Sequence, residues 1–316
     1  MIKTINAPWF RFFLATSALA SAAWAQSYAY VANSKGNNVT VFDRATGRAT
    51  ALITVAGSPT GVAVAPGGAS VYVTAEASNH VVVINAATNT VSATIPVGSL
   101  PTRVAVSPNG ALAYVSNQSG NSVSVIQTST HTVVATVPVG SRPAGIAFTP
   151  DGSHAMVANI FSSTVSVIST ATHSVTATWH TASGPNGVVI NPAGTLAYVA
   201  NQNANVVTVH NVSTGAIVST LTGFVYPNAV AISPDGNHLY VTNANAASLS
   251  VINTSTHAVT AKIPLGPLPT SLALSRDGST LYSTNSLGYS LTVINTATNT
   301  AVTMPRIGIV PVSVGL

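Results

Sequence analysis

The sequence contains no cysteine and few charged residues. Only 5% of its 316 residues are charged, whereas ordinary soluble domains carry about 25%. Without cysteine, neither disulfides nor thiol chemistry contributes to stability or reactivity. Solubility must therefore depend on the abundant Ser, Thr and Asn side chains.

Acidic residues are especially scarce. The chain has five Asp and Glu residues against ten Lys and Arg, and a hard-cation site needs several converging carboxylates. The sequence also lacks a Gly-x-Ser-x-Gly elbow, a His-x-x-x-His pair and a glycine-rich phosphate loop. We therefore expect no catalytic residues, no metal site and no cofactor.

The one long apolar run lies near the N-terminus. It covers residues 12–23, follows two basic residues and ends at Ala23-Trp24-Ala25, which has the small-x-small form of a signal-peptidase site. The run is too short for a stable membrane span. We therefore expect residues 1–25 to be a cleaved signal peptide, with no later span and no lipid-accepting cysteine. The mature protein should be periplasmic or secreted.

The rest of the chain is dominated by an internal repeat. Seven copies of a phrase related to Tyr-Val-Ala-Asn follow one another at steps of 42 residues, and a proline keeps the same period. Two landmarks in phase, without an insertion, indicate seven equivalent units. The phrases begin at Tyr30, Tyr72, Tyr114, Met156, Tyr198, Tyr240 and Tyr282; the prolines are Pro59, Pro101, Pro143, Pro185, Pro227, Pro269 and Pro311.

Each unit reads as four short strands. In the unit that begins at Pro101, short strand-like runs at 104–106, 113–117, 122–126 and 133–137 alternate with turn signals. Four strands per unit, repeated seven times, are typical of a β-propeller. The last residues supply a first strand and residues 28–31 a second strand. We therefore predict one all-β domain over 26–316, a seven-bladed propeller closed by pairing of the C-terminal and N-terminal strands.

The repeat also carries a family resemblance. Tyr-Val-x-Asn, followed by Val-Ser-Val-Ile and by Pro-Val-Gly-Ser-x-Pro, resembles the YVTN-repeat β-propellers of exported bacterial proteins and archaeal surface layers. The resemblance covers the mature chain and implies the fold but no particular activity, although a few members are reported to bind DNA. Two departures stand out: Ala75 replaces the Asn of the second copy, and the Asp usual after Val-x-Val-Ile remains only at Asp43.

Residues that break the repeat on one face are candidates for a binding site. We expect that face to be formed by the links around each proline and the loops after each Tyr-Val-x-Asn. Arginines, amides and aromatics there could hold an anionic or planar ligand; the alternative is a solvated rim with incidental aromatics. The candidates are Arg103, Arg142, Tyr226, Asn186, Asn228, His180, Phe224, Glu76, Phe161 and Tyr289.

Four histidines are better explained by structure. His131, His173 and His257 share a repeat position with Gly and Asn, which tolerate positive φ in tight turns. His210 stands where other units have Ile or Phe, so we expect a core residue whose nitrogens are satisfied.

These observations favour an exported, non-enzymatic binding or scaffold propeller. We expect a monomer that acts through one face of the ring on an envelope protein or glycan. Two alternatives remain. One is a nucleic-acid-binding propeller with DNA as partner, although the net charge of +3 left without Lys3 and Arg11 is spread thinly. The other is a lactonase-type or lyase-type enzyme, for which Glu76 and His180 would be the residues of interest.

Overall fold

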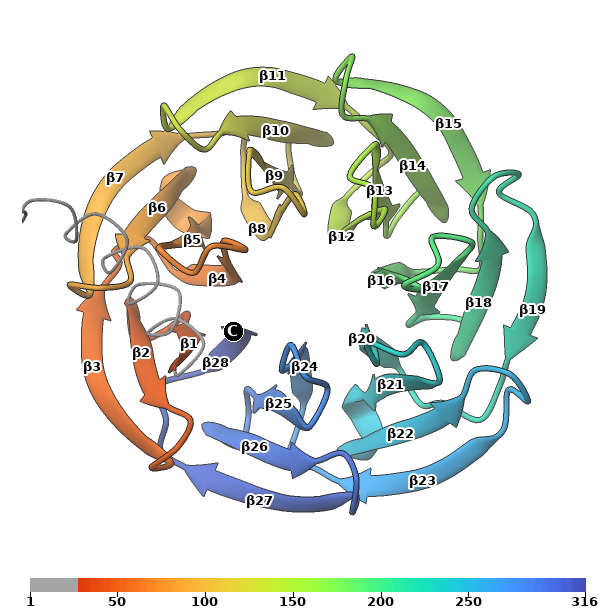
Figure 1. The fold of residues 1–316 in the computed structure, drawn as a ribbon. Helices are drawn as coiled ribbons and strands as arrows, with labels where there is room; N and C mark the ends of the chain where they lie inside the picture. Colours follow the sequence, from red (N-terminus) through yellow and green to blue (C-terminus); the bar gives the residue numbers. More distant parts are fainter. Residues whose placement is uncertain (1–27) are drawn as a thin grey trace, which may run out of the picture.

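The computed structural model describes residues 28–316, which form a closed ring of seven four-stranded antiparallel sheets (Figure 1). Each sheet is one blade, with its first strand at the central opening and its fourth at the circumference. The predicted all-β, seven-bladed propeller is confirmed. The expected signal peptide at residues 1–25 lies outside the described residues.

The blades have nearly identical strand lengths, because the repeat has no insertions. Two short 3-10 helices, η1 (Glu76–Ser78) and η2 (Ala244–Ala246), follow second strands. In order around the ring the blades are: blade 1, β28 (Pro311–Gly315), β1 (Tyr28–Asn33), β2 (Asn38–Asp43), β3 (Arg48–Thr54); blade 2, β4 (Pro59–Val64), β5 (Ser70–Ala75), β6 (His80–Asn85), β7 (Thr90–Pro96); blade 3, β8 (Pro101–Val106), β9 (Leu112–Asn117), β10 (Ser122–Gln127), β11 (Thr132–Pro138); blade 4, β12 (Pro143–Phe148), β13 (His154–Asn159), β14 (Thr164–Ser169), β15 (Ser174–His180); blade 5, β16 (Pro185–Ile190), β17 (Leu196–Asn201), β18 (Val206–Asn211), β19 (Ile217–Leu221); blade 6, β20 (Pro227–Ile232), β21 (His238–Asn243), β22 (Ser248–Asn253), β23 (Val259–Pro264); blade 7, β24 (Pro269–Leu274), β25 (Thr280–Asn285), β26 (Ser290–Asn295), β27 (Thr300–Pro305).

The ring is closed by the last strand. β28 pairs antiparallel with β1, with Tyr30 opposite Gly315 and Val31 opposite Val314. Val314 is 4% exposed and packs with buried residues of blades 1 and 7, among them Phe42 and Tyr282. The predicted pairing of the two terminal strands is therefore confirmed.

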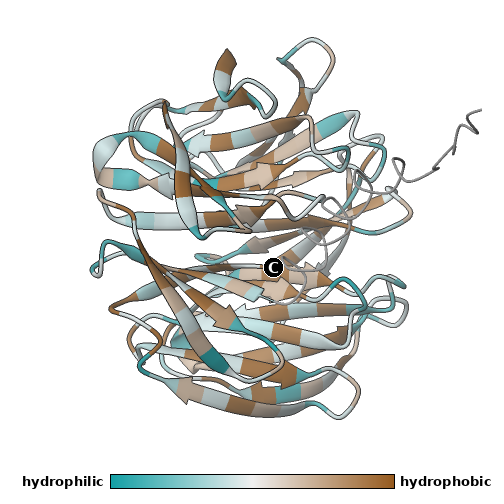
Figure 2. Cartoon of the chain, turned by 60° about the vertical axis from the view of Figure 1, so that its left-hand side comes forward, coloured by the Kyte–Doolittle hydropathy of each residue, from teal (hydrophilic) through white to brown (hydrophobic). Residues whose placement is uncertain are grey.

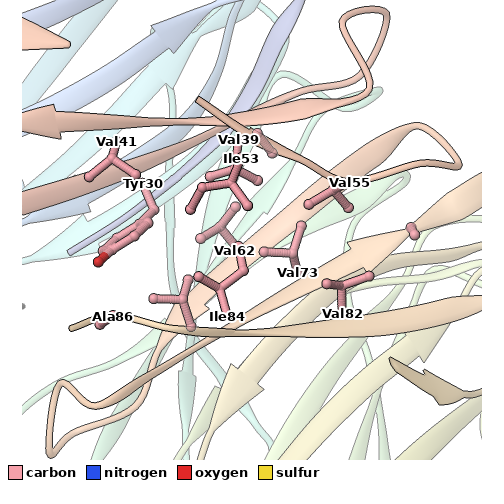
Figure 3. Close-up of a cluster of buried hydrophobic side chains, with 13 residues drawn as sticks. Tyr30, Val39, Val41, Ile53, Val55, Val62, Val73, Val82, Ile84 and Ala86 are labelled. Carbon is pink, nitrogen blue, oxygen red and sulfur yellow. The ribbon is translucent and has the colours of Figure 1, made fainter. Parts of the chain in front are cut away.

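The core lies between the blades. Between blades 1 and 2, Tyr30, Val41 and Ile53 pack against Val62 and Ile84 (Figure 3). Seen from the side, hydrophobic residues follow the strands while many connecting loops are hydrophilic (Figure 2). Because a single blade is apolar on both faces, each sheet depends on its neighbours for burial.

The Asn that recurs in six of the seven copies of the repeat ties the second strand to the third. Asn117 Nδ2 donates to Ser122 Oγ at 3.1 Å and to Ser124 Oγ at 3.0 Å. Equivalent bonds to Ser or Thr hydroxyls recur in other blades, for example at Asn285. In each of the six blades that have this Asn, a third-strand Ser or Thr seven residues later accepts the hydrogen bond from its amide.

The structural histidines lie as predicted. His131, His173 and His257 have φ values of 55°, 50° and 60°. His210 is 0% exposed; its Nδ1 lies 3.0 Å from the Gly215 carbonyl oxygen, and its Nε2 contacts two threonine hydroxyls. Both nitrogens are thus satisfied, and no ligand is needed to explain this residue.

No helix within residues 28–316 has the length and hydrophobicity needed to cross a membrane.

Candidate functional site

A cavity of about 570 Å³ occupies the centre of the ring, at the end where the links and the post-Asn loops lie. We call it the mouth. A narrower space of about 180 Å³, the throat, continues from it. Arg103, Asn186, Asn228 and Thr270 line both, so the two spaces form one channel.

A β-bulge after each repeated proline builds the channel wall. The register between the first and second strands of every blade shifts directly after the proline, and such bulges re-aim the side chains beside them. Second-strand hydroxyls accept hydrogen bonds from the displaced backbone N–H groups; for example, Arg103 N donates to Ser116 Oγ at 3.2 Å. The residues after the prolines all line the mouth: Thr60, Thr102, Ala144, Asn186, Asn228, Thr270 and Val312.

The next tier consists of small residues with one exception. A Cβ at Gly61 would lie 2.7 Å from the Thr102 carbonyl oxygen, and one at Gly187 would lie 2.6 Å from that of Asn228, so the inner strands pack too closely there for larger side chains. The tier contains Gly61, Gly145, Gly187, Ala229, Ser271, Ser313 and, as its one long side chain, Arg103.

Arg103 has unused hydrogen-bonding capacity. Its Nη1 makes one long bond, 3.4 Å, to the Thr102 carbonyl oxygen, whereas a guanidinium carries five N–H donors. Among the described residues, no carboxylate oxygen lies within ion-pair distance of it. Burial lowers the pKa of Arg103, and the charge of Glu76 opposes that effect. Arginine side chains stay protonated in proteins, so the guanidinium of Arg103 can offer its remaining N–H donors to a ligand.

Glu76 supplies the one carboxylate of the mouth. It begins η1, directly after β5, and is half-buried. Burial raises the pKa of the Glu76 carboxyl above its ordinary value of 4.5, while the positive charges of Arg103 and Lys35 act in the opposite direction. Opposite charges from blades 2 and 3 thus share the cavity.

Three amides of blades 5 and 6 form a chain on the wall of the mouth. Asn186 Nδ2 donates to Gln202 Oε1 at 2.9 Å and to Asn228 Oδ1 at 2.8 Å. Asn228 Nδ2 makes no hydrogen bond to another described residue. This chain fixes the orientation of the amides and leaves a donor at the channel wall.

Residues directly before the prolines form part of the mouth rim. Arg142 and Tyr226 have positive φ values of 57° and 54°, and each backbone N–H is held by an Asn side chain of the preceding blade. The Arg142 guanidinium lies 4.5 Å from the ring centroid of Phe161, which is 66% exposed. This cation–π pair forms a flat, positively charged edge.

The structure brings seven of the ten predicted residues together and separates three. Those at the mouth are Arg103, Arg142, Tyr226, Asn186, Asn228, Glu76 and Phe161. His180 is exposed at the end of β15, on the circumference. Phe224 is 5% exposed within an interblade core. Tyr289 lines a separate hollow with Arg306 and Ile309.

Sequence reasoning missed several polar residues of the mouth. Thr60, Thr102, Thr270, Gln118 and Gln202 all line it. Threonine, serine and asparagine are common throughout the chain, so their residue type does not mark them. The usable signal was position, because every residue directly after a repeated proline lines the mouth.

The mouth end of the ring carries an excess of positive charge. The links and post-Asn loops of the mouth end carry Lys35, Arg103, Arg142 and Arg306 against Glu76. The four Asp lie at the other end together with Arg44, Arg48 and Arg276. Hydrogen bonds from neighbouring hydroxyl and backbone groups lower the pKa of Asp151, Asp235 and Asp277 to about 2. Within residues 28–316, no group of three His, Asp or Glu is placed to hold a metal.

Comparison with known proteins supports the fold. The sequence matches the family described as Choice-of-anchor I domain over residues 112–268, just under half of the chain. A comparison with curated proteins gave no match.

Three solved structures illustrate the similarity. Hydrazine synthase of Kuenenia stuttgartiensis is 25% identical, with a TM-score of 0.79 over 86% of this chain and 93% of that one. A functionally unknown protein from Desulfotomaculum acetoxidans is 17% identical, with a TM-score of 0.79 over 91% and 98%. A putative 6-phosphogluconolactonase from Bacteroides uniformis is 18% identical, with a TM-score of 0.76 over 92% and 99%. The last two similarities concern the fold alone.

Proposed function

We propose that this chain is an exported, non-enzymatic binding propeller of the YVTN-repeat type that holds a small carboxylate-bearing ligand in the mouth of its central channel. The observation that carries the proposal is Arg103, a long cationic side chain in a tier of small residues, whose guanidinium has one weak hydrogen bond and no ion pair among the described residues. An exported protein would meet such ligands as free solutes or as parts of envelope proteins and glycans.

The chemistry of the mouth suits an anion of modest size. A carboxylate can accept two parallel hydrogen bonds from one guanidinium, and Asn228 Nδ2 is a further donor on the wall of the same cavity. The mouth, about 570 Å³, falls within the range of about 300–1,000 Å³ that is usual for small-molecule sites. The positive excess at this end would also favour the approach of an anion.

Calorimetric titration with short carboxylates tests the proposal. Arg103→Gln should weaken carboxylate binding by about 10- to 150-fold, because a hydrogen bond to a charged group contributes about 1.5–3 kcal/mol. Arg306→Gln is the matched control, since it removes the same charge from an exposed residue at the same end but outside the mouth. Equal affinities for the wild type and Arg103→Gln would contradict the proposal.

A second candidate, nucleic-acid binding, draws on the positive excess of the mouth end. It predicts that the affinity for single-stranded DNA falls steeply with salt, by about 0.7 logarithmic units per phosphate contact and tenfold change in salt. A flat salt dependence would dismiss it. A lactonase-type role has less support, because Glu76 is the one carboxylate lining the mouth. Lactone hydrolysis by the purified chain would be required to revive it.

A further inference from the structure

Glu76 and Arg103 share the mouth without forming an ion pair. They come from neighbouring blades, and both line the same cavity. Each affects the other electrostatically, yet among the described residues no oxygen–nitrogen contact within 4.0 Å joins them. Opposite charges are therefore held near one another with space between them.

This arrangement is unfavourable in the unliganded protein. A partly desolvated charge loses hydration, and a direct partner would normally compensate for that loss. Here the carboxylate and the guanidinium each lack such a partner. A ligand that presents an ammonium group to Glu76 and a carboxylate to Arg103 would satisfy both at once.

We infer that the mouth binds a small zwitterion whose ammonium and carboxylate groups are a few bonds apart, an α-amino acid being the simplest. The inference rests on the proposed function and narrows it. Arg103 would hold the carboxylate and Glu76 would hold the ammonium group, since the two residues come from adjacent blades and line the same cavity. The hydrogen bond from Asn186 to Asn228 joins blades 5 and 6, so the amides on that wall are already held in place without a ligand.

The remaining wall of the mouth indicates the side chain of the ligand. Ile160, Tyr226, Leu268 and Val312 line it together with Phe161, which is largely exposed. Apolar surface would be buried there if the ligand carried an aliphatic or aromatic group. We therefore expect neutral amino acids with apolar side chains to bind more tightly than glycine.

Matched pairs of ligands test the contributions of Glu76 and Arg103 separately. Calorimetry at pH 7 with glycine, alanine, leucine and phenylalanine is paired with the corresponding carboxylates that lack the amino group: acetate, propanoate, 4-methylpentanoate and 3-phenylpropanoate. The tightest amino acid should bind at least about tenfold better than its deaminated partner, because the contact with Glu76 is charge-assisted. The amine without a carboxylate, 2-phenylethylamine, should bind far more weakly than phenylalanine.

Two variants then assign the roles. Glu76→Gln should weaken the tightest amino acid by about 10- to 150-fold while leaving its deaminated partner unchanged or tighter. Arg103→Gln should weaken both. Arg306→Gln should change neither, and circular dichroism spectra matching the wild type confirm that each variant is folded.

Each outcome decides the inference. If the amino acids and their deaminated partners bind equally well, and Glu76→Gln affects neither, the zwitterion inference is overturned while the carboxylate site of the proposed function stands. If no ligand of either series binds to folded wild-type protein, the inference and the small-carboxylate proposal both fail. Binding that needs both Glu76 and Arg103 supports both.

Discussion

Substitution of one residue in the closing strand should weaken the entire ring. Val314 is 4% exposed and joins β28 to the core shared by blades 1 and 7. Val314→Ala removes two methyl groups, worth about 1.6 kcal/mol at about 0.8 kcal/mol each, and leaves a cavity that adds to the loss. We expect the free energy of unfolding to fall by about 2–3 kcal/mol, a large part of the roughly 5–15 kcal/mol usual for a folded protein.

The assay uses a probe on the other side of the ring. Trp179 lies in blade 4, away from β28 (Figure 1), and it is the one tryptophan of residues 26–316, so the fluorescence of a protein made of those residues reports that region. Guanidinium unfolding is followed by this fluorescence and by far-UV circular dichroism. If closure couples all blades, Val314→Ala should lower both midpoints equally.

The matched control is Val302→Ala in β27. Val302 is 63% exposed, so the same chemical change should alter the unfolding free energy by no more than about 0.5 kcal/mol. A shift in the circular dichroism midpoint without a shift in Trp179 fluorescence would refute the reasoning, because it would show that blades unfold separately.

Three further predictions concern stability. Gly145→Ala should lower the free energy of unfolding by about 1–3 kcal/mol, because the new Cβ would collide with the Asn186 carbonyl oxygen. In the same thermal melts, the control Gly67→Ala should leave the stability unchanged, because its Cβ meets nothing within 4 Å. Burial lowers the pKa of His210 below its ordinary value of 6.5, so stability should fall as the pH drops from about 7 through the lowered pKa. His210→Ile, the residue type of most other blades, should flatten that dependence, and an unchanged slope would contradict the assignment. Hydrogen bonds lower the pKa of Asp277 from 3.8 to about 2. Its stabilising contribution is therefore present above pH 4 and is lost as the pH falls through 2. In an acid titration followed by circular dichroism, the stability of Asp277→Asn should depend less on pH over that range than the stability of the wild type.

The sequence was sufficient to predict the fold because the information is local and repeated seven times. The strand runs, the turn residues and the proline links recur at one spacing, so an ambiguous unit could be interpreted from the others. Met156 in place of Tyr and Ala75 in place of Asn did not disturb that interpretation. Closure was predictable because the two terminal segments complete one blade.

The candidate site was predicted less completely, because side-chain direction was unknown. Residues unlike their counterparts were easy to find, but whether they point into the channel depends on the bulge after each proline and on the positive φ before it. Phe224, in a link to its proline, instead turns into the interblade core. Conversely, Thr270 and Gln202 line the mouth, but nothing about their residue types marked them as unusual in the sequence.

The tier of small residues has a consequence for ligand length. Ala229, Ser271 and Ser313 occupy positions equivalent to Arg103 and already carry a Cβ. An arginine placed at any of them, with Arg103 replaced by a small residue, would present its charge from a different blade, while Glu76 would stay in blade 2. The number of blades between the two charges would then set the distance between the charged groups of the ligand that fits. Adjacent blades suit a short zwitterion, and blades across the ring suit one whose charged ends lie farther apart.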